Sequence, residues 1–245
     1  MICLSFDSDY MLQEDMQRFV QEFPFPGHAT FFLHRKYEVD FQGHERAPHP
    51  ILAEAGDWMA TVNTLVHELG ITPVGVRTHS CVSSQTFSAM LAKQRYLYSS
   101  VVTLFYETGL KPYKHPWGLW ELPMYYMDNS DFCMPMNWPG SEHQPFHRDV
   151  IRKAVAEPGL YVFDFHPLHI ILNTRTYNDY LEVREAIRSG KTSAFDLAVV
   201  GNGTRAFFLD LCKEMERYGL KSSNCIEALR PYRHLGSLGD QPVDL

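Results

Sequence analysis

Titratable side chains recur in this sequence directly after short apolar runs of the kind that form buried strands. Four such groups stand out: Asp7 and Asp9; His44 and His49; Arg77 and His79; and His166. In α/β barrels and open parallel sheets, the carboxyl ends of the strands lie together and build the functional site. The four groups should therefore converge on one end of the fold, which is harder to obtain by accident than any single motif.

The first two groups contain the side chains of a divalent metal site. Asp9, His44 and His49 supply one carboxylate and two imidazoles, ligand types with which a catalytic metal keeps a position open for water. The cofactor expected from them is a divalent metal ion, with zinc first. The simpler alternatives are that Asp9 only caps the following helix and that the two histidines are solvated in a polar loop.

The remaining titratable groups would complete a site for hydrolysing an amide or an ester. Asp7 would take the proton of the attacking water, and Arg77 would keep Asp7 ionised, because a neighbouring cation lowers the pKa of a carboxyl group. His166 would protonate the leaving amine as a general acid. Arg77 and His166 also have purely structural alternatives. Arg77 could be only an ion-pair partner, and His166 only a buried, hydrogen-bonded core histidine.

Further side chains are candidates for contact with a substrate: His79, Trp117, Glu121 and Asn173. His79 is also the reserve metal ligand, should one of the loop histidines not bind. Trp117 could stack against a sugar ring, although packing in the core is the commoner role of such a residue. Glu121 could pair with a basic group at the site or lie at the surface.

The elements that must position these groups alternate between strand and helix. Strands are predicted over residues 2–6, 29–33, 37–41, 74–76, 96–103, 119–124 and 160–165, and helices over about 12–23, 51–69, from Ser83 or Ser84 onward, and 204–218. Gly70 is placed to end the second helix. Residues 128–146, rich in Pro, Met and Asn, are expected to form a long loop. The alternation predicts one α/β domain over residues 1–245 with a parallel sheet.

Composition limits the class of partner. The 245 residues are 45% hydrophobic with a formal net charge of -7, so the chain can fill a sizeable core but lacks the basic surplus that nucleic-acid binding needs. No apolar stretch approaches the roughly 20 residues of a membrane span, and no signal peptide is recognised. The five scattered cysteines fit free thiols in a reducing compartment. The expected location is the cytoplasm, without stable membrane insertion.

The same residues resemble the motifs of the polysaccharide deacetylase (NodB-homology) superfamily. The run SFDSD at residues 5–9 is similar to the first motif, in which one carboxylate is a base and the next a metal ligand. The run ATFF at 29–32 resembles the strand that follows it. VRTHS at 76–80 resembles the third motif, whose arginine orients the base, and FDFHP at 163–167 the late motif that ends in the acid histidine.

Within that superfamily, the chain most resembles the small branch associated with bacterial O-antigen gene clusters. The likeness extends over residues 77–80, 117–123 and 165–169, with Asn173-Thr174, and over 203–205. The second motif departs from the common pattern, in which two histidines are four apart, because His44 and His49 are five apart with Pro48 between them. Either the loop is rearranged or a different pair binds the metal, with His79 in reserve.

The resemblance implies an irregular (β/α) barrel of about seven parallel strands with a metal-dependent hydrolase site. Its activity would remove an N-acetyl or similar acyl group from an amino sugar in the synthesis of a glycan or an O-antigen precursor. The expected partner is a small carbohydrate linked to a nucleotide or a lipid, and a homo-oligomer is left open. Two alternatives remain: a hydrolase of cyclic amides or formyl groups from the same superfamily, and a non-catalytic barrel that serves as a binding partner.

Overall fold

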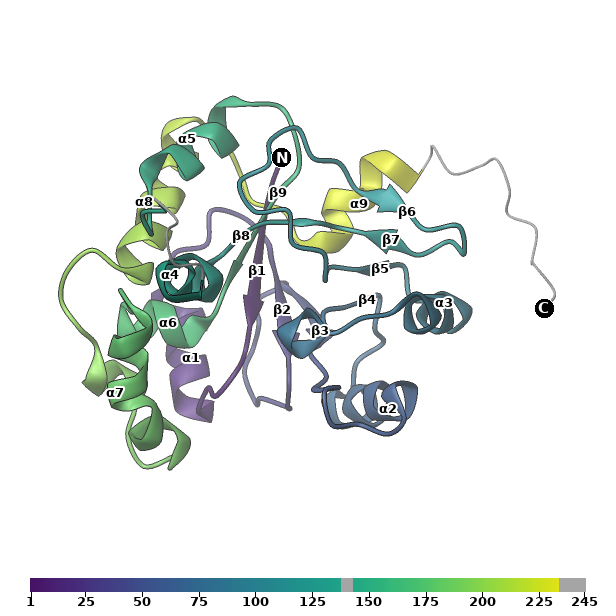
Figure 1. Cartoon of the computed structure of the whole chain (residues 1–245), viewed down its shortest axis with the longest axis horizontal. Helices are drawn as coiled ribbons and strands as arrows, with labels where there is room; N and C mark the ends of the chain where they lie inside the picture. Colours follow the sequence, from purple (N-terminus) through teal and green to yellow (C-terminus); the bar gives the residue numbers. More distant parts are fainter. Residues whose placement is uncertain (138–142, 234–245) are drawn as a thin grey trace.

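The computed structural model of the chain describes residues 1–137 and 143–233, in which strands and helices alternate (Figure 1). The strands are β1 (Ile2–Asp7), β2 (Ala29–Leu33), β3 (Glu45–Pro48), β4 (Gly75–Val76), β5 (Tyr98–Ser99), β6 (Tyr113–Lys114), β7 (Trp120–Glu121), β8 (Met124–Met127) and β9 (Tyr161–Phe165). The helices are α1 (Gln13–Glu22), α2 (Trp58–Leu69), α3 (Gln85–Lys93), α4 (Asp128–Asn137), α5 (Arg148–Ala156), α6 (Pro167–Leu172), α7 (Tyr177–Arg188), α8 (Thr204–Arg217) and α9 (Cys225–Arg233), with short 3-10 turns η1 (His79–Cys81) and η2 (Ala194–Leu197).

The strands form two sheets. The first is a five-stranded parallel sheet in the order β3-β2-β1-β9-β8, with β1 at its centre. The second has the order β4-β5-β7-β6, in which only β6 runs antiparallel to its neighbour. The α/β class and the mainly parallel sheet are therefore confirmed. The predicted barrel is not observed, because the described strands divide between two sheets and do not close into one.

Hydrogen bonds outside the named ladders bring the edges of the two sheets together. The backbone N–H of Arg77, just after β4, donates to the carbonyl oxygen of Pro48 in β3 at 3.3 Å. Strands β3 and β4 therefore run side by side, so the residues that follow each of them emerge at the same edge.

The two faces of β1 have different roles, because successive side chains of a strand point to opposite sides. Ile2, Leu4 and Phe6 belong to the large apolar cluster beneath the helices. Ser5 and Asp7 point the other way, where both contact the guanidinium of Arg77. A strand that is buried on both faces needs a nearly continuous apolar run, and the interruptions in β1 are the residues that meet Arg77.

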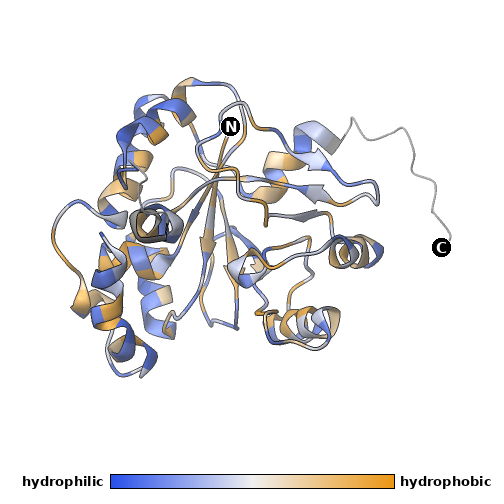
Figure 2. Ribbon diagram, in the orientation of Figure 1, coloured by the Kyte–Doolittle hydropathy of each residue, from blue (hydrophilic) through white to orange (hydrophobic). Residues whose placement is uncertain are grey.

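Helices cover the first sheet on the side away from the second. Helices α1, α5, α6 and α8 contribute to the same apolar cluster as β1, β2 and β9, and Figure 1 shows them together on one side of the molecule. Helices α2 and α3 pack with β4 in a separate cluster. Figure 2 shows apolar colour concentrated in the central strands, with polar residues on the helices.

Several local predictions are confirmed and others are wrong. Gly70 ends α2 in the left-handed conformation, and Ser84 caps α3 by accepting from the N–H of Phe87. The predicted strand over 37–41 is wrong, since the third strand is β3. The predicted loop over 128–146 is wrong where α4 forms, and residues 138–142 lie outside the described part. Helix α9 was not predicted. Among the described residues, no helix is long and apolar enough to cross a membrane.

Candidate metal centre and active site

The polar side chains that follow the parallel strands meet at the carboxyl edge of the two sheets. Asp7 is the last residue of β1 and Asp9 follows it, His49 comes directly after β3, and Arg77 directly after β4. Asp128 follows β8 and His166 follows β9. Each strand is held in register by its neighbours, so these side chains are fixed by the most buried part of the fold.

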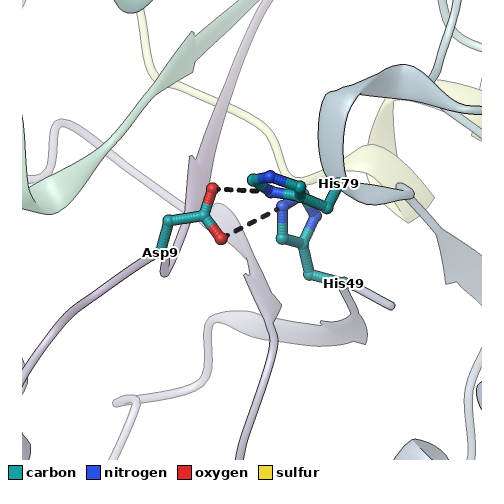
Figure 3. A group of neighbouring side chains, drawn as sticks. All are labelled: Asp9, His49 and His79. Carbon is teal, nitrogen blue, oxygen red and sulfur yellow. Dashed lines mark ion pairs between the residues drawn. The ribbon is translucent and has the colours of Figure 1, made fainter. Parts of the chain in front are cut away.

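Asp9, His49 and His79 form a cluster in which one carboxylate oxygen and one nitrogen from each imidazole lie within 4.8 Å of one another (Figure 3). Nδ1 of His79 is 2.9 Å from Oδ2 of Asp9, and Nε2 of His49 is 3.6 Å from Oδ1 of the same carboxylate. Burial by itself raises the pKa of Asp9, but the charges and hydrogen bonds of the surrounding histidines lower it far below its ordinary value.

The second nitrogen of His49 fixes its orientation. Nδ1 lies 3.0 Å from the backbone oxygen of Arg77, and because a carbonyl only accepts, Nδ1 carries the proton. When the imidazole is neutral, its lone pair is on Nε2, which faces the Asp9 carboxylate. A ring nitrogen that donates to a backbone carbonyl is the usual support of a metal-binding histidine.

Two atoms in this cluster lack the partners that burial normally demands. Nε2 of His49 and Nδ1 of His79 are both buried, and although each lies near the Asp9 carboxylate, neither completes a well-aligned hydrogen bond. Buried polar atoms are seldom left unpaired, and a site for a bound ion is one of the accepted reasons for it. The donor set of one carboxylate and two imidazoles suits a divalent metal of the zinc type. These three residues could therefore hold a metal.

His44, predicted as a metal ligand, does not belong to this cluster. It precedes β3 whereas His49 follows it, so the two histidines are separated by the length of the strand, about 16 Å at the usual rise per residue. Nδ1 of His44 accepts from the backbone N–H of Ala29, and its ring lies 4.8 Å from that of Phe25. His79 stands beside Asp9 in its place.

Arg77 links two buried carboxylates behind the cluster. Its side chain has no exposed surface, and NH1 bonds to Oδ1 of Asp7 at 3.1 Å and also to Asp164 of β9. The backbone oxygen and the hydroxyl of Ser100 accept from Nε and NH2, each at 2.9 Å. The guanidinium therefore fixes the orientation of Asp7, which lies 3.6 Å from Nε2 of His49.

His166 also lies beside Asp9, with Nε2 3.8 Å from Oδ2 of that carboxylate. Its Nδ1 lies 2.7 Å from Oδ1 of Asp128, whose Oδ2 accepts from the backbone N–H of His166. Burial by itself lowers the pKa of His166, but the charge and hydrogen bond of Asp128, aided by Asp164 and Asp7, raise it to about 10. Nε2 of a protonated His166 can donate into the space beside Asp9.

A pocket of about 240 Å³ opens onto these side chains. It is lined by residues from the β1–α1 connection, η1, α4, α6 and α7: Asp9, Tyr10, His79, Asn129, Ser130, Phe132, Cys133, His166, Leu168, His169, Tyr177 and Tyr180. A lining that combines tyrosine rings with titratable groups is the composition expected of a site for a small polar ligand.

Three of the four predicted substrate-binding residues do not line this pocket and have structural roles elsewhere. Trp117 lies in the β6–β7 connection, at the amino end of β7, where its ring stacks 5.0 Å from that of His115. Glu121 is fully buried and accepts from the backbone N–H groups of Val101 and Val102.

Asn173, the third of them, caps α6 in the left-handed conformation. Its amide nitrogen donates to the backbone oxygens of Val199 and Gly201. Of the four predicted contacts, only His79 lines the pocket.

Comparison with known protein families matches residues 9–184 to the WbmS-like polysaccharide deacetylases. The chain belongs to this family. The resemblance drawn from the motifs is therefore confirmed, and carbohydrate deacetylation is the activity that membership supports. Comparison with curated proteins finds no match.

One solved structure of a deacetylase has a similar fold, and a second is matched less well. A candidate polysaccharide deacetylase involved in O-antigen biosynthesis, from Bordetella bronchiseptica, is 21% identical over 87% of this chain and 90% of its own, with a TM-score of 0.67. A candidate polysaccharide deacetylase from Mycobacterium smegmatis is 17% identical over 90% of this chain and 91% of its own, with a TM-score of 0.46.

A solved structure with lower sequence identity is the 4-alpha-glucanotransferase from Thermococcus litoralis. It is 11% identical over 95% of this chain but only 38% of its own, with a TM-score of 0.52. At such low identities, these solved structures indicate the fold of the chain and not its substrate.

Sequence reasoning missed two carboxylates of the site in this family member. Asp128 would have been found by the rule that found Asp7 and His166, since it directly follows an apolar strand, but that strand was predicted to end at residue 124 and ends at 127. Asp164 lies inside β9 and its only signal is a charged residue within a buried strand. A fully buried carboxylate requires a partner, and Arg77 is that partner.

Proposed function

We propose that this protein is a metal-dependent hydrolase that removes an acetyl group from the nitrogen of an amino sugar. The observation that carries the proposal is the meeting of Asp9, His49 and His79, with Asp7 beside His49 and His166 beside Asp9. In line with the resemblance to the O-antigen branch, the sugar would be a precursor in the synthesis of a surface glycan.

Asp9, His49 and His79 would hold the metal. When bound there, a divalent ion would supply Lewis acidity to the acyl oxygen and make water a better nucleophile at neutral pH. Asp7 would accept the proton from the attacking water, because its other oxygen is held by Arg77 at 3.1 Å and the free one faces the cluster.

His166 would deliver a proton to the departing nitrogen. An amine leaves only when it is protonated, and the Nε2 proton of His166 points toward the space above Asp9 while Asp128 holds the opposite ring nitrogen. The two proton-transfer groups then stand on opposite sides of the amide, as general base and general acid.

The metal set is tested by elemental analysis after mild dialysis, with zinc, cobalt or nickel supplied beforehand. We expect near-stoichiometric metal in the wild type and its loss in Asp9→Ala, His49→Ala and His79→Ala. The loss should exceed the roughly 10–100-fold in affinity that follows removal of a hydrogen-bond partner behind a ligand. His44→Ala is the matched control and should keep its metal, because that histidine lies at the far end of β3.

The activity is tested by acetate release from a panel of N-acetylated amino sugars. Wild-type protein without metal after reconstitution, or a His44→Ala variant that loses as much metal as His79→Ala, would contradict the proposed ligand set. Metal-loaded protein that releases formate or opens a cyclic amide, but releases no acetate, would instead favour the other amide chemistries of the superfamily.

A further inference from the structure

One face of α7 runs from the pocket outward. Tyr177, Tyr180, Arg184 and Arg188 are spaced by three, four and four residues, a spacing that places side chains on the same face of a helix. Both tyrosines line the pocket, and both arginines lie close enough to Tyr180 to interact electrostatically with its phenol group. Two aromatic rings at the pocket are thus followed by two cations one and two turns further along α7.

Tyr10 connects Arg188 to the catalytic residues. It follows Asp9 in the chain, lines the same pocket and has a positive φ of 56°, a conformation that a bulky side chain rarely adopts. NH2 of Arg188 donates to the hydroxyl of Tyr10 at 3.1 Å, and its guanidinium carbon lies 4.8 Å from the centre of the tyrosine ring. The guanidinium is therefore held by a residue that lines the pocket and is next to Asp9 in the chain.

Arg188 is available to an anion. Among the described residues, no carboxylate lies within ion-pairing distance of its guanidinium, whereas Arg184 has one partner, Glu185, at 3.3 Å. Arg188 is exposed, and it bonds to a residue that lines the pocket, in a chain with a net charge of -7. A planar guanidinium beside a phenol hydroxyl matches the geometry of phosphate oxygens, which arginine binds through two parallel hydrogen bonds.

The dimensions of the pocket suit one sugar with phosphate attached. Its 240 Å³ falls below the roughly 300–1,000 Å³ of pockets for drug-sized ligands, so it holds a single ring better than a stretch of polymer. One peptide step and the length of a tyrosine side chain place the guanidinium of Arg188 roughly 10 Å from Asp9. A sugar that is deacylated at Asp9 and carries a diphosphate on the neighbouring anomeric carbon would reach that far.

We infer that Arg188, held by Tyr10 and supported by Arg184, binds the phosphate of a glycosyl diphosphate whose amino sugar occupies the pocket. This rests on the proposed function and narrows its substrate class to sugars activated with a diphosphate, as opposed to neutral glycan chains. The diphosphate could be esterified to a nucleoside or to a polyprenol, since the recognised group is the same in both.

The test compares binding of three probes to the metal-loaded full chain by calorimetry: UDP-N-acetylglucosamine, a short-chain farnesyl diphosphate N-acetylglucosamine, and the neutral disaccharide of N-acetylglucosamine. We expect at least one diphosphate sugar to bind tighter than the disaccharide. Arg188→Gln should reduce that ratio by about 10-fold, the size expected for one charged hydrogen-bonding group. Arg188→Lys should restore part of it, and the ratio should depend less on salt in Arg188→Gln than in the wild type.

Arg217→Gln, at an exposed arginine of α8, is the control for loss of one surface charge and should leave the ratio unchanged. Equal affinities for charged and neutral probes, or a ratio that Arg188→Gln does not change, would overturn the inference and leave the deacetylase proposal standing. Binding that depends on Arg188, without acetate release from any probe, would support the diphosphate site and contradict the deacetylase proposal. Preference for the nucleotide or the farnesyl probe identifies the source of the diphosphate.

Discussion

Replacing Asp128 by Asn should make His166 lose its proton at a lower pH, with little change in the shape of the site. The carboxylate has no exposed surface and accepts from both Nδ1 and the backbone N–H of His166, at 2.7 and 2.8 Å. An amide of the same size removes the charge and offers a single acceptor oxygen, so one of these two bonds is lost.

The magnitude follows from the pKa of His166. The value of about 10, against an ordinary 6.5, corresponds to about 5 kcal/mol in favour of the protonated ring. Asp128 is the leading contribution that raises it, ahead of Asp164 and Asp7. If Asp128 accounts for about half of this rise, Asp128→Asn lowers the pKa of His166 by about 2, which corresponds to about 3 kcal/mol.

The assay is NMR titration of the His166 imidazole in metal-free protein, together with the pH profile of acetate release by the loaded enzyme. In Asp128→Asn both should move to lower pH, with the alkaline decline in kcat/KM beginning earlier. The matched control is Asp131→Asn in the same helix. Asp131 is equally buried but bonds to Tyr106 and Tyr126, so that variant should lose stability and keep the profile. An unmoved His166 titration in Asp128→Asn would refute the reasoning.

Two further predictions concern stability. Arg77→Met leaves the carboxylates of Asp7 and Asp164 buried without their cation, and urea unfolding should show a loss of about 3–5 kcal/mol at neutral pH; a loss below 1 kcal/mol would contradict the assigned role. Burial lowers the pKa of His169 to about 4 from 6.5, so its neutral form stabilises the fold fully above pH 6.5, and this contribution is lost as pH falls toward 4. In metal-free protein, the free energy of unfolding should therefore fall with acid by about 3 kcal/mol less in His169→Gln than in the wild type. An equal fall in the two proteins would disprove this.

The corrected ligand set shows why tertiary contacts were needed to choose among the histidines. Spacing along the chain made His44 and His49 a natural pair, but a strand lies between them and directs them to opposite ends of the sheet. His79 is distant from Asp9 in sequence and reaches it because β4 runs beside β3. Glu121, interpreted as a site residue, instead satisfies backbone N–H groups inside the second sheet.

The sequence by itself determined the features that depend on local pattern. Apolar runs of strand length end in Asp7, Arg77 and His166, and parallel strands place such ends at one edge, so the meeting of these residues and the family could be predicted without coordinates. The tertiary structure decided three other features. These are which histidines approach Asp9, that Asp128 bonds to His166 and Asp164 to Arg77, and that the strands form two sheets. These depend on contacts between residues far apart in the chain, whose energies leave no periodic trace in a single sequence.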